Sequence, residues 1–130
     1  MQRRVVCMVE KRQELEGLLA ELRKIGDVEA SAIIRRDGLM IASDMPSYVD
    51  GRTIAAMTAA LIGAGETTIG ELKLGEFGQA IVDSEKGKLV AMGAGSQAVL
   101  ACLVGKDANL GLILVNMEKS SKRIAELLSG

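Results

Sequence analysis

The segment Gly93–Ala98 has the spacing G-x-G-x-x-A, which in dinucleotide-binding folds lets the backbone approach a pyrophosphate. In those folds a helix begins directly after the glycines, because the free N–H groups at its N-terminus hold the phosphates. The residues that follow here, Val99–Val104, have the apolar pattern of a strand instead. We therefore interpret Gly93–Gln97 as a connector between strands and expect no cofactor.

The other groups that could support catalysis are sparse. The chain contains no histidine, so the commonest general base and metal ligand is absent. Cys7 and Cys102 fit no metal-ligand spacing, and both stand among apolar residues, which predicts buried free thiols. Three arginines near predicted turns or caps, Arg35, Arg36 and Arg52, could contribute charge to a partner's active site, but solvation explains each of them. We expect no catalytic residue, no metal ligand and no enzyme activity.

The charge balance excludes further classes of partner. The 16 basic and 17 acidic residues of the 130-residue chain are scattered, giving a net charge of −1 and no basic stripe for nucleic acid. The apolar run Val5–Val9 is too short for a signal-peptide core. The longest uncharged run, Leu89–Gly105, is broken by glycines and falls short of a membrane span. We expect a cytoplasmic protein with no nucleic-acid partner and no membrane span.

The elements that would position these residues form one domain over residues 1–130. Leucines at helical spacing predict a helix over about Lys11–Ile25, ended by Gly26, with residues 1–9 as an N-terminal extension. Two apolar runs around Asp37-Gly38 predict a β-hairpin over Glu29–Ala42. A second helix is predicted to about Glu71, capped either by a Ser47–Asp50 capping box or by Asp50 itself.

Three more strands and a helix complete the pattern. The strands are predicted at Glu76–Asp83, Lys88–Met92 and Val99–Val104, and the last helix is capped by Asp107 or Asn109. The order α-β-β-α-β-β-β-α indicates an α+β fold, with a five-stranded antiparallel sheet and helices on its faces.

The second helix has an unusual composition, because Thr53–Gly65 are thirteen consecutive uncharged residues. One side is predicted to carry the larger residues and the other only alanine and glycine, and neither resembles a solvated face. The larger residues are Ile54, Met57, Thr58, Leu61 and Ile62; the small ones are Ala56, Ala59, Ala60, Gly63 and Ala64. We expect one side to face the domain's core and the other a second subunit; the alternative is a helix enclosed within one monomer.

These features together resemble the Roadblock/dynein light chain family, whose domains are profilin-like α/β sandwiches. The resemblance extends from about Glu10 to Leu128. It rests on the opening helix Leu15…Leu18-Leu19…Leu22…Ile25, on Val28 and the strand Ala30–Ile34, on Asp37-Gly38-Leu39-Met40-Ile41-Ala42, on the alanine-rich helix and on Asp107-Ala-Asn109-Leu-Gly111.

The resemblance implies a homodimer or heterodimer in which the central helices, here Ile54–Gly65, pack together. The third strands, here Glu76–Asp83, would pair edge to edge into one ten-stranded sheet. The expected dimer interface comprises Ile54, Met57, Ala60, Leu61, Ala64, Glu76, Phe77, Gly78, Gln79, Ala80 and Ile81.

The resemblance also implies a function as an adaptor or regulator that binds a small Ras-like GTPase and modulates its nucleotide cycle, or that scaffolds a complex. The alternative is a small-ligand sensor or binding module that uses the Gly93–Gln97 loop, since the same architecture serves ligand modules in other families. Convergent polar groups among aromatic side chains, which mark ligand pockets, are scarce in this chain.

Overall fold

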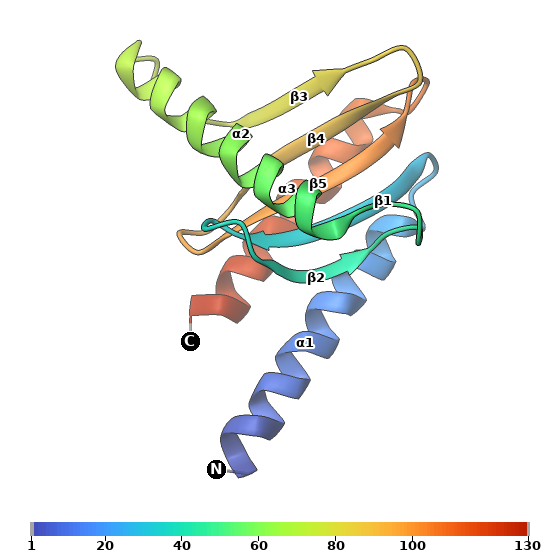
Figure 1. Ribbon diagram of the computed structural model, residues 1–130, viewed down its shortest axis with the longest axis vertical. Coiled ribbons are helices and arrows are strands. Elements are labelled where there is room, and N and C mark those ends of the chain that lie inside the picture. The colour runs from blue at the N-terminus through green and yellow to red at the C-terminus, as the bar shows by residue number, and fades with distance from the viewer. Residues whose placement is uncertain (1, 130) are drawn as a thin grey trace.

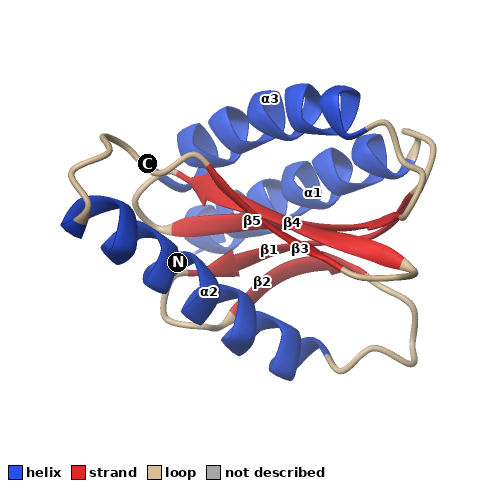
Figure 2. Ribbon diagram, turned by 90° about the horizontal axis from the view of Figure 1, so that it is seen from above, coloured by secondary structure: helices blue, strands red, loops and turns tan. Residues whose placement is uncertain are grey.

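The computed structural model describes the backbone of residues 2–129 and the side chains of residues 10–129. Five strands form one antiparallel sheet in the order β2-β1-β5-β4-β3. Helices α1 (Gln2–Arg23) and α3 (Leu110–Ser129) lie on one face of the sheet, and α2 (Gly51–Glu71) lies alone on the other (Figure 2). The predicted order of elements and the sheet type are therefore confirmed, with three helices in two outer layers.

Helix α1 begins earlier than predicted. The expected start at Lys11 is wrong, because the helix is continuous from Gln2 and ends at Arg23. No proline or glycine interrupts the chain before Leu15, so nothing stops the helix from extending through residues 2–9. Leu15, Leu19 and Leu22 are buried against the sheet. The burial predicted for Cys7 lies outside the described side chains.

The predicted hairpin forms from β1 (Val28–Arg35) and β2 (Met40–Asp44). Its turn needs Gly38, which has a φ of +97° and would place a Cβ 3.5 Å from the Cα of Ala56. The hairpin tip therefore lies directly against the first half of α2, which fixes the position of that helix on the sheet.

Helix α2 is capped by Asp50, the second of the two predicted alternatives. The Asp50 carboxylate accepts hydrogen bonds from the backbone N–H groups of Arg52 and Thr53, and from the Thr53 hydroxyl at 2.9 Å. These bonds, from the Thr53 hydroxyl above all, lower the pKa of Asp50 below its ordinary value. The charged form of the cap is thus the one that the fold favours.

The remaining strands are β3 (Gln79–Asp83), β4 (Gly87–Ala94) and β5 (Ala98–Gly105). The predicted strand start at Glu76 is wrong, because residues 76–78 belong to a connector in which Phe77 packs against Gly65 of α2. A Cβ at Gly65 would lie only 2.7 Å from the Phe77 ring, so the glycine makes room for it. The last helix is capped by Asn109, whose Oδ1 accepts from the N–H of Leu112 at 3.1 Å.

Two apolar layers result from this arrangement. The larger lies between the sheet and helices α1 and α3, and includes Ile33, Leu100, Ile113 and Ile124. The smaller lies between the sheet and α2, and includes Ile34, Ala55, Ile62 and Val99. Helix α2 runs diagonally from the β2 side of the sheet to the β3 side (Figure 1), so a single helix spans the whole second face.

Arg36 connects three of these elements at one end of the sheet. Its Nη1 donates to Glu66 of α2 at 2.6 Å, and its Nη2 donates to the carbonyl oxygen of Gly95, in the β4–β5 turn, at 3.0 Å. The side chain is 30% exposed, so these charge-assisted bonds are partly shielded from water. Arg36 therefore holds the hairpin, α2 and the β4–β5 turn together.

We expect Arg36→Ala to lower the free energy of unfolding by about 1–2 kcal/mol, because it removes charged hydrogen bonds in a partly shielded site. Chemical denaturation followed by circular dichroism would measure the change. The matched control is Arg12→Ala, since Arg12 makes an exposed ion pair with Glu16 at 3.4 Å and should contribute less than about 0.5 kcal/mol. Equal effects of the two substitutions would contradict the role of Arg36.

Candidate functional site

The outward face of α2 is the most distinctive surface of the molecule. Ala55, Thr58 and Ile62 are the buried residues of the helix. Of the predicted large-residue side, Thr58 and Ile62 are buried, whereas Met57 is 66% exposed beside the small residues. Met57, Ala60 and Ala64 form an exposed stripe without charge, while Ile54 and Leu61 lie half-buried at its sides.

Strand β3 continues this surface at the edge of the sheet. It pairs with β4 on one side only, and within residues 2–129 no strand pairs with its outer side. Ile81 and Val82 are 40% and 46% exposed, and Gln79 is exposed while Ala80 is half-buried. We call Met57, Ala60, Ala64 and Val82, together with the open edge of β3, the α2–β3 surface. Val82 pairs with Leu89 and shares the face of α2, whereas Ile81 pairs with Val90 and lies on the other face. The surface includes Met57, Ala60 and Ala64 of the residues expected at an interface, and Ile81 belongs to its edge strand.

The connector between α2 and β3 adds residues that the sequence analysis missed. Leu72 and Leu74 are 61% and 66% exposed, on either side of Lys73. Of the connector residues that were expected at the interface, Glu76 and Gly78 are exposed and Phe77 is half-buried on α2. The signal that could have identified the leucines is the alternation Leu72-Lys73-Leu74 directly after a predicted helix end.

The Gly93–Gln97 loop, the alternative site, borders two hollows. The smaller has a volume of about 140 Å³ and is bounded by α3 through Ala125 and Leu128. The larger, reached by Gln97, is a more open hollow of about 530 Å³ lined also by Arg35, Arg36 and Asp37. Ligand pockets commonly measure about 300–1,000 Å³. A Cβ on Gly95 would lie 2.8 Å from that of Ala125, so the loop's glycine serves close packing against α3. The chain after the loop is strand β5, as predicted, and no helix begins there.

Of the side chains considered for chemistry, Cys102, Arg36 and Arg35 are engaged within the fold. Burial raises the pKa of the Cys102 thiol to about 12, so this cysteine is protonated and unreactive at neutral pH. Arg36 is engaged as described above, and Arg35 pairs with Asp37 at 2.7 Å. Arg52 is exposed in the first turn of α2. Among the described side chains, no three acidic, cysteine or histidine residues are grouped to hold a metal ion.

None of the helices described over residues 2–129 combines the length and the apolar character that crossing a membrane requires. The features that stand out in the described structure are therefore apolar surfaces and an open strand edge. Surfaces of this kind bind other polypeptides.

Comparison with known proteins agrees with this architecture. The model of the Roadblock/LC7 domain family matches residues 14–104. The uncharacterized protein MJ1340 of Methanocaldococcus jannaschii is 34% identical over 110 residues, which cover 85% of this chain and 96% of that protein.

Solved structures show the same fold. Myxococcus xanthus MglB has a TM-score of 0.83 at 19% identity, covering 91% of this chain and 90% of MglB. A further MglB structure, described as having a tetrameric arrangement, has a TM-score of 0.81 at 19% identity and covers 92% and 90% of the two chains. Acanthamoeba castellanii profilin II aligns with a TM-score of 0.51 at 17% identity over 78% and 87%, consistent with the expected profilin-like sandwich. From the match over residues 14–104 and the similarity to MJ1340, the chain belongs to the Roadblock/LC7 domain family.

Proposed function

We propose that the chain forms a homodimer through the α2–β3 surface, and that the dimer is an adaptor or regulator of a small Ras-like GTPase without an active site of its own. The observation that carries the dimer is the uncharged outward face of α2 beside the open edge of β3. The role with a GTPase is supported by membership of the Roadblock/LC7 family.

The outward face of α2 supports the dimer because it lacks what a solvated helix face normally has. Helices on protein surfaces carry charged or polar residues on the side that faces water. Here Met57, Ala60 and Ala64 occupy that side, and the helix has no charged residue between Arg52 and Glu66. Small residues let a second helix approach closely, so two copies of α2 can pack against each other.

The edge of β3 supports the same arrangement. An open edge strand presents unpaired N–H and C=O groups, and proteins usually protect such edges with charges, prolines or bulges. In β3 the charged residue is Asp83, at the strand's last position, where it pairs with Lys88 at 2.8 Å. The four residues Gln79–Val82 have no such protection, so β3 is free to pair with the β3 of a second copy about a two-fold axis.

The adaptor role agrees with the side chains described above. Arg36 is bound to Glu66 and Gly95, and so is not available to insert into the active site of another protein. We expect regulation of a GTPase to act through surface contacts that reposition the GTPase's own residues. The MglB structure with a tetrameric arrangement is consistent with self-association in this fold.

The dimer predicts the effect of a charge on α2. Ala60→Glu places a carboxylate in the centre of the α2–β3 surface, where burial without a partner costs several kcal/mol. The variant should be monomeric at concentrations at which the wild type is dimeric, as measured by size-exclusion chromatography with light scattering.

The matched control is Ala20→Glu, which makes the same change at an exposed site on α1, on the other face of the sheet. This control should remain dimeric. A folded Ala60→Glu variant that stays dimeric would contradict the proposed interface.

The proposed GTPase partner leads to a second prediction. The wild-type dimer, used as bait in a lysate of the source organism with GTPγS or GDP, should retain a small GTPase that mass spectrometry identifies. Enrichment with GTPγS is expected, because effectors and activators recognise the triphosphate state. The Ala60→Glu bait tests whether the dimer is required.

An assay with the purified chain and the purified GTPase then distinguishes an activator from a scaffold. Faster GTP hydrolysis with stoichiometric chain identifies an activator, whereas binding at an unchanged rate identifies a scaffold. Absence of any GTPase in both nucleotide states would contradict the proposed partner.

A further inference from the structure

The C-terminal end of α2 presents an apolar projection. The helix ends in a turn in which Lys73 has a φ of +55°, and the N–H of Leu74 donates back to the carbonyl of Ile69 at 3.2 Å. This 6→1 bond is typical of a Schellman motif, which fixes the exit of the chain. Leu72 and Leu74 are both more than half exposed there. Figure 1 shows the last turns of α2 extending past β3, beyond the edge of the sheet.

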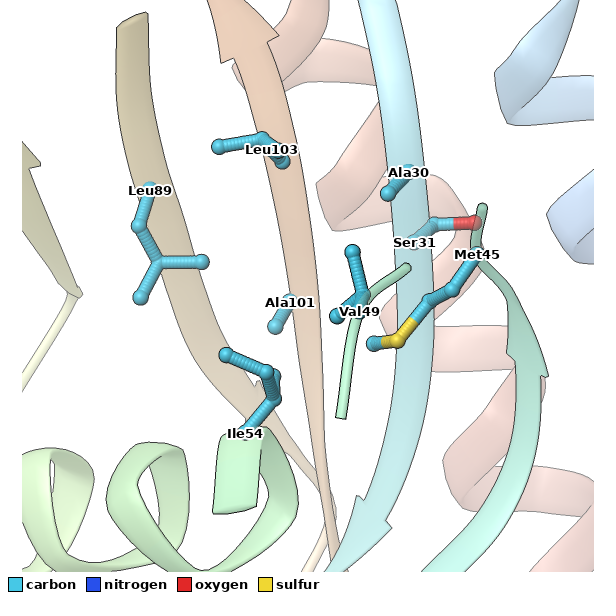
Figure 3. A pocket seen from close by; sticks show the side chains of 8 residues that line it. All are labelled: Ala30, Ser31, Met45, Val49, Ile54, Leu89, Ala101 and Leu103. Atoms are coloured by element: carbon cyan, nitrogen blue, oxygen red, sulfur yellow. The ribbon is translucent and has the colours of Figure 1, made fainter. Parts of the chain in front are cut away.

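An apolar groove lies at the opposite end of α2. Ile54 of α2 and Val49 of the preceding loop face Leu89, Leu103, Ala30 and Ala101 of the sheet across it (Figure 3). Its volume is about 70 Å³. None of the residues that line it is charged, and Leu89 and Leu103 remain half-buried. The groove is the part of the second sheet face that α2 leaves uncovered.

The two features lie at opposite ends of the open edge strand. Leu72 and Leu74 precede the first residue of β3, whereas Leu89 is paired with Val82 near the last residue of β3. Antiparallel pairing of β3 with the β3 of a second copy reverses the direction of the partner strand. Leu72 and Leu74 of each copy therefore lie at the end of the other copy's β3 that is beside the groove, on the same face of the sheet.

We propose that the projection carrying Leu72 and Leu74 in each protomer packs over the groove of the other, so that this site is complete only in the dimer. The inference rests on the homodimer proposed above. A two-fold axis makes the contact reciprocal, because each copy offers one projection and one groove. The groove therefore belongs to the interface between copies of this chain.

The size of the groove and the length of α2 support this occupant. Ligand pockets commonly measure about 300–1,000 Å³, far more than the 70 Å³ available here. The chain's own leucines do not reach the groove, because the 18 residues from Ile54 to Leu72 span about 27 Å of helix. In the proposed contact, the leucines that cover the groove therefore belong to the second copy.

Disulfide trapping tests the contact directly. One chain carries Leu74→Cys and the other Leu89→Cys, with different affinity tags, both in a Cys7→Ser background; the buried Cys102 remains in place. A disulfide requires Cα atoms within about 7 Å. Mild oxidation should produce a linked pair that contains both tags, with the joined peptides identified by mass spectrometry.

The matched control replaces Leu89→Cys with Leu112→Cys. Leu112 is 50% exposed on α3, on the other face of the sheet, so no linked pair should form with Leu74→Cys.

A second measurement tests the contact even if the geometry of the two thiols does not allow a disulfide. The double variant Leu72→Ser, Leu74→Ser should raise the dimer dissociation constant by about tenfold or more, because it removes two buried leucines. Leu112→Ser should leave that constant unchanged.

The outcomes separate this inference from the one on which it rests. A linked pair or the expected rise in the dissociation constant supports the reciprocal contact. A dimer by light scattering that shows neither effect overturns the contact and leaves the dimer. A wild-type chain that is monomeric overturns both.

Discussion

Three helices cover the two faces of the sheet, so one face is covered by a single helix. The rest of the structure depends on this incomplete cover. Two helices, α1 and α3, complete a core on one face, whereas α2 alone spans the other along a diagonal. A single helix cannot cover five strands, so an apolar groove remains at one end and the helix passes beyond the sheet at the other. The uncharged composition of α2 fits the same constraint, because in the proposed dimer both of its sides make apolar contacts.

Several charged side chains in this molecule connect elements of the fold. Arg36 holds the hairpin, α2 and the β4–β5 turn together, and Arg123 joins α1 to α3 through Glu14 at 2.8 Å. The surfaces left for binding are apolar, and their partners must be recognised by shape and by strand pairing. Surfaces of this kind suit the adaptor role proposed here, in which the chain would position other proteins.

The sequence predicted the order of elements and the sheet because these depend on local signals: Gly38 for the hairpin, Asp50 for the helix start and alternating apolar runs for the strands. It did not predict which side of α2 faces inward. Ala55 is buried and Met57 exposed, because the line of the helix that contacts the sheet runs through Ala55, Thr58 and Ile62, a direction that residue size alone does not indicate. The connector residues Leu72, Leu74 and Phe77 depend likewise on a tertiary contact, the packing of Phe77 on Gly65, which periodicity does not encode.

The absence of charge along the outward face of α2 bears on how this chain would choose among related chains in one cell. Families of paired proteins commonly encode partner choice in patterns of opposite charge, which repel wrong pairings. Between Arg52 and Glu66 this helix has no charged residue, so in the proposed dimer charge on α2 would not distinguish the helix of a related chain from its own. Discrimination between self and paralogue would then depend on side-chain volume at the two ends of α2, and a change of one methyl group there could redirect assembly without altering the fold.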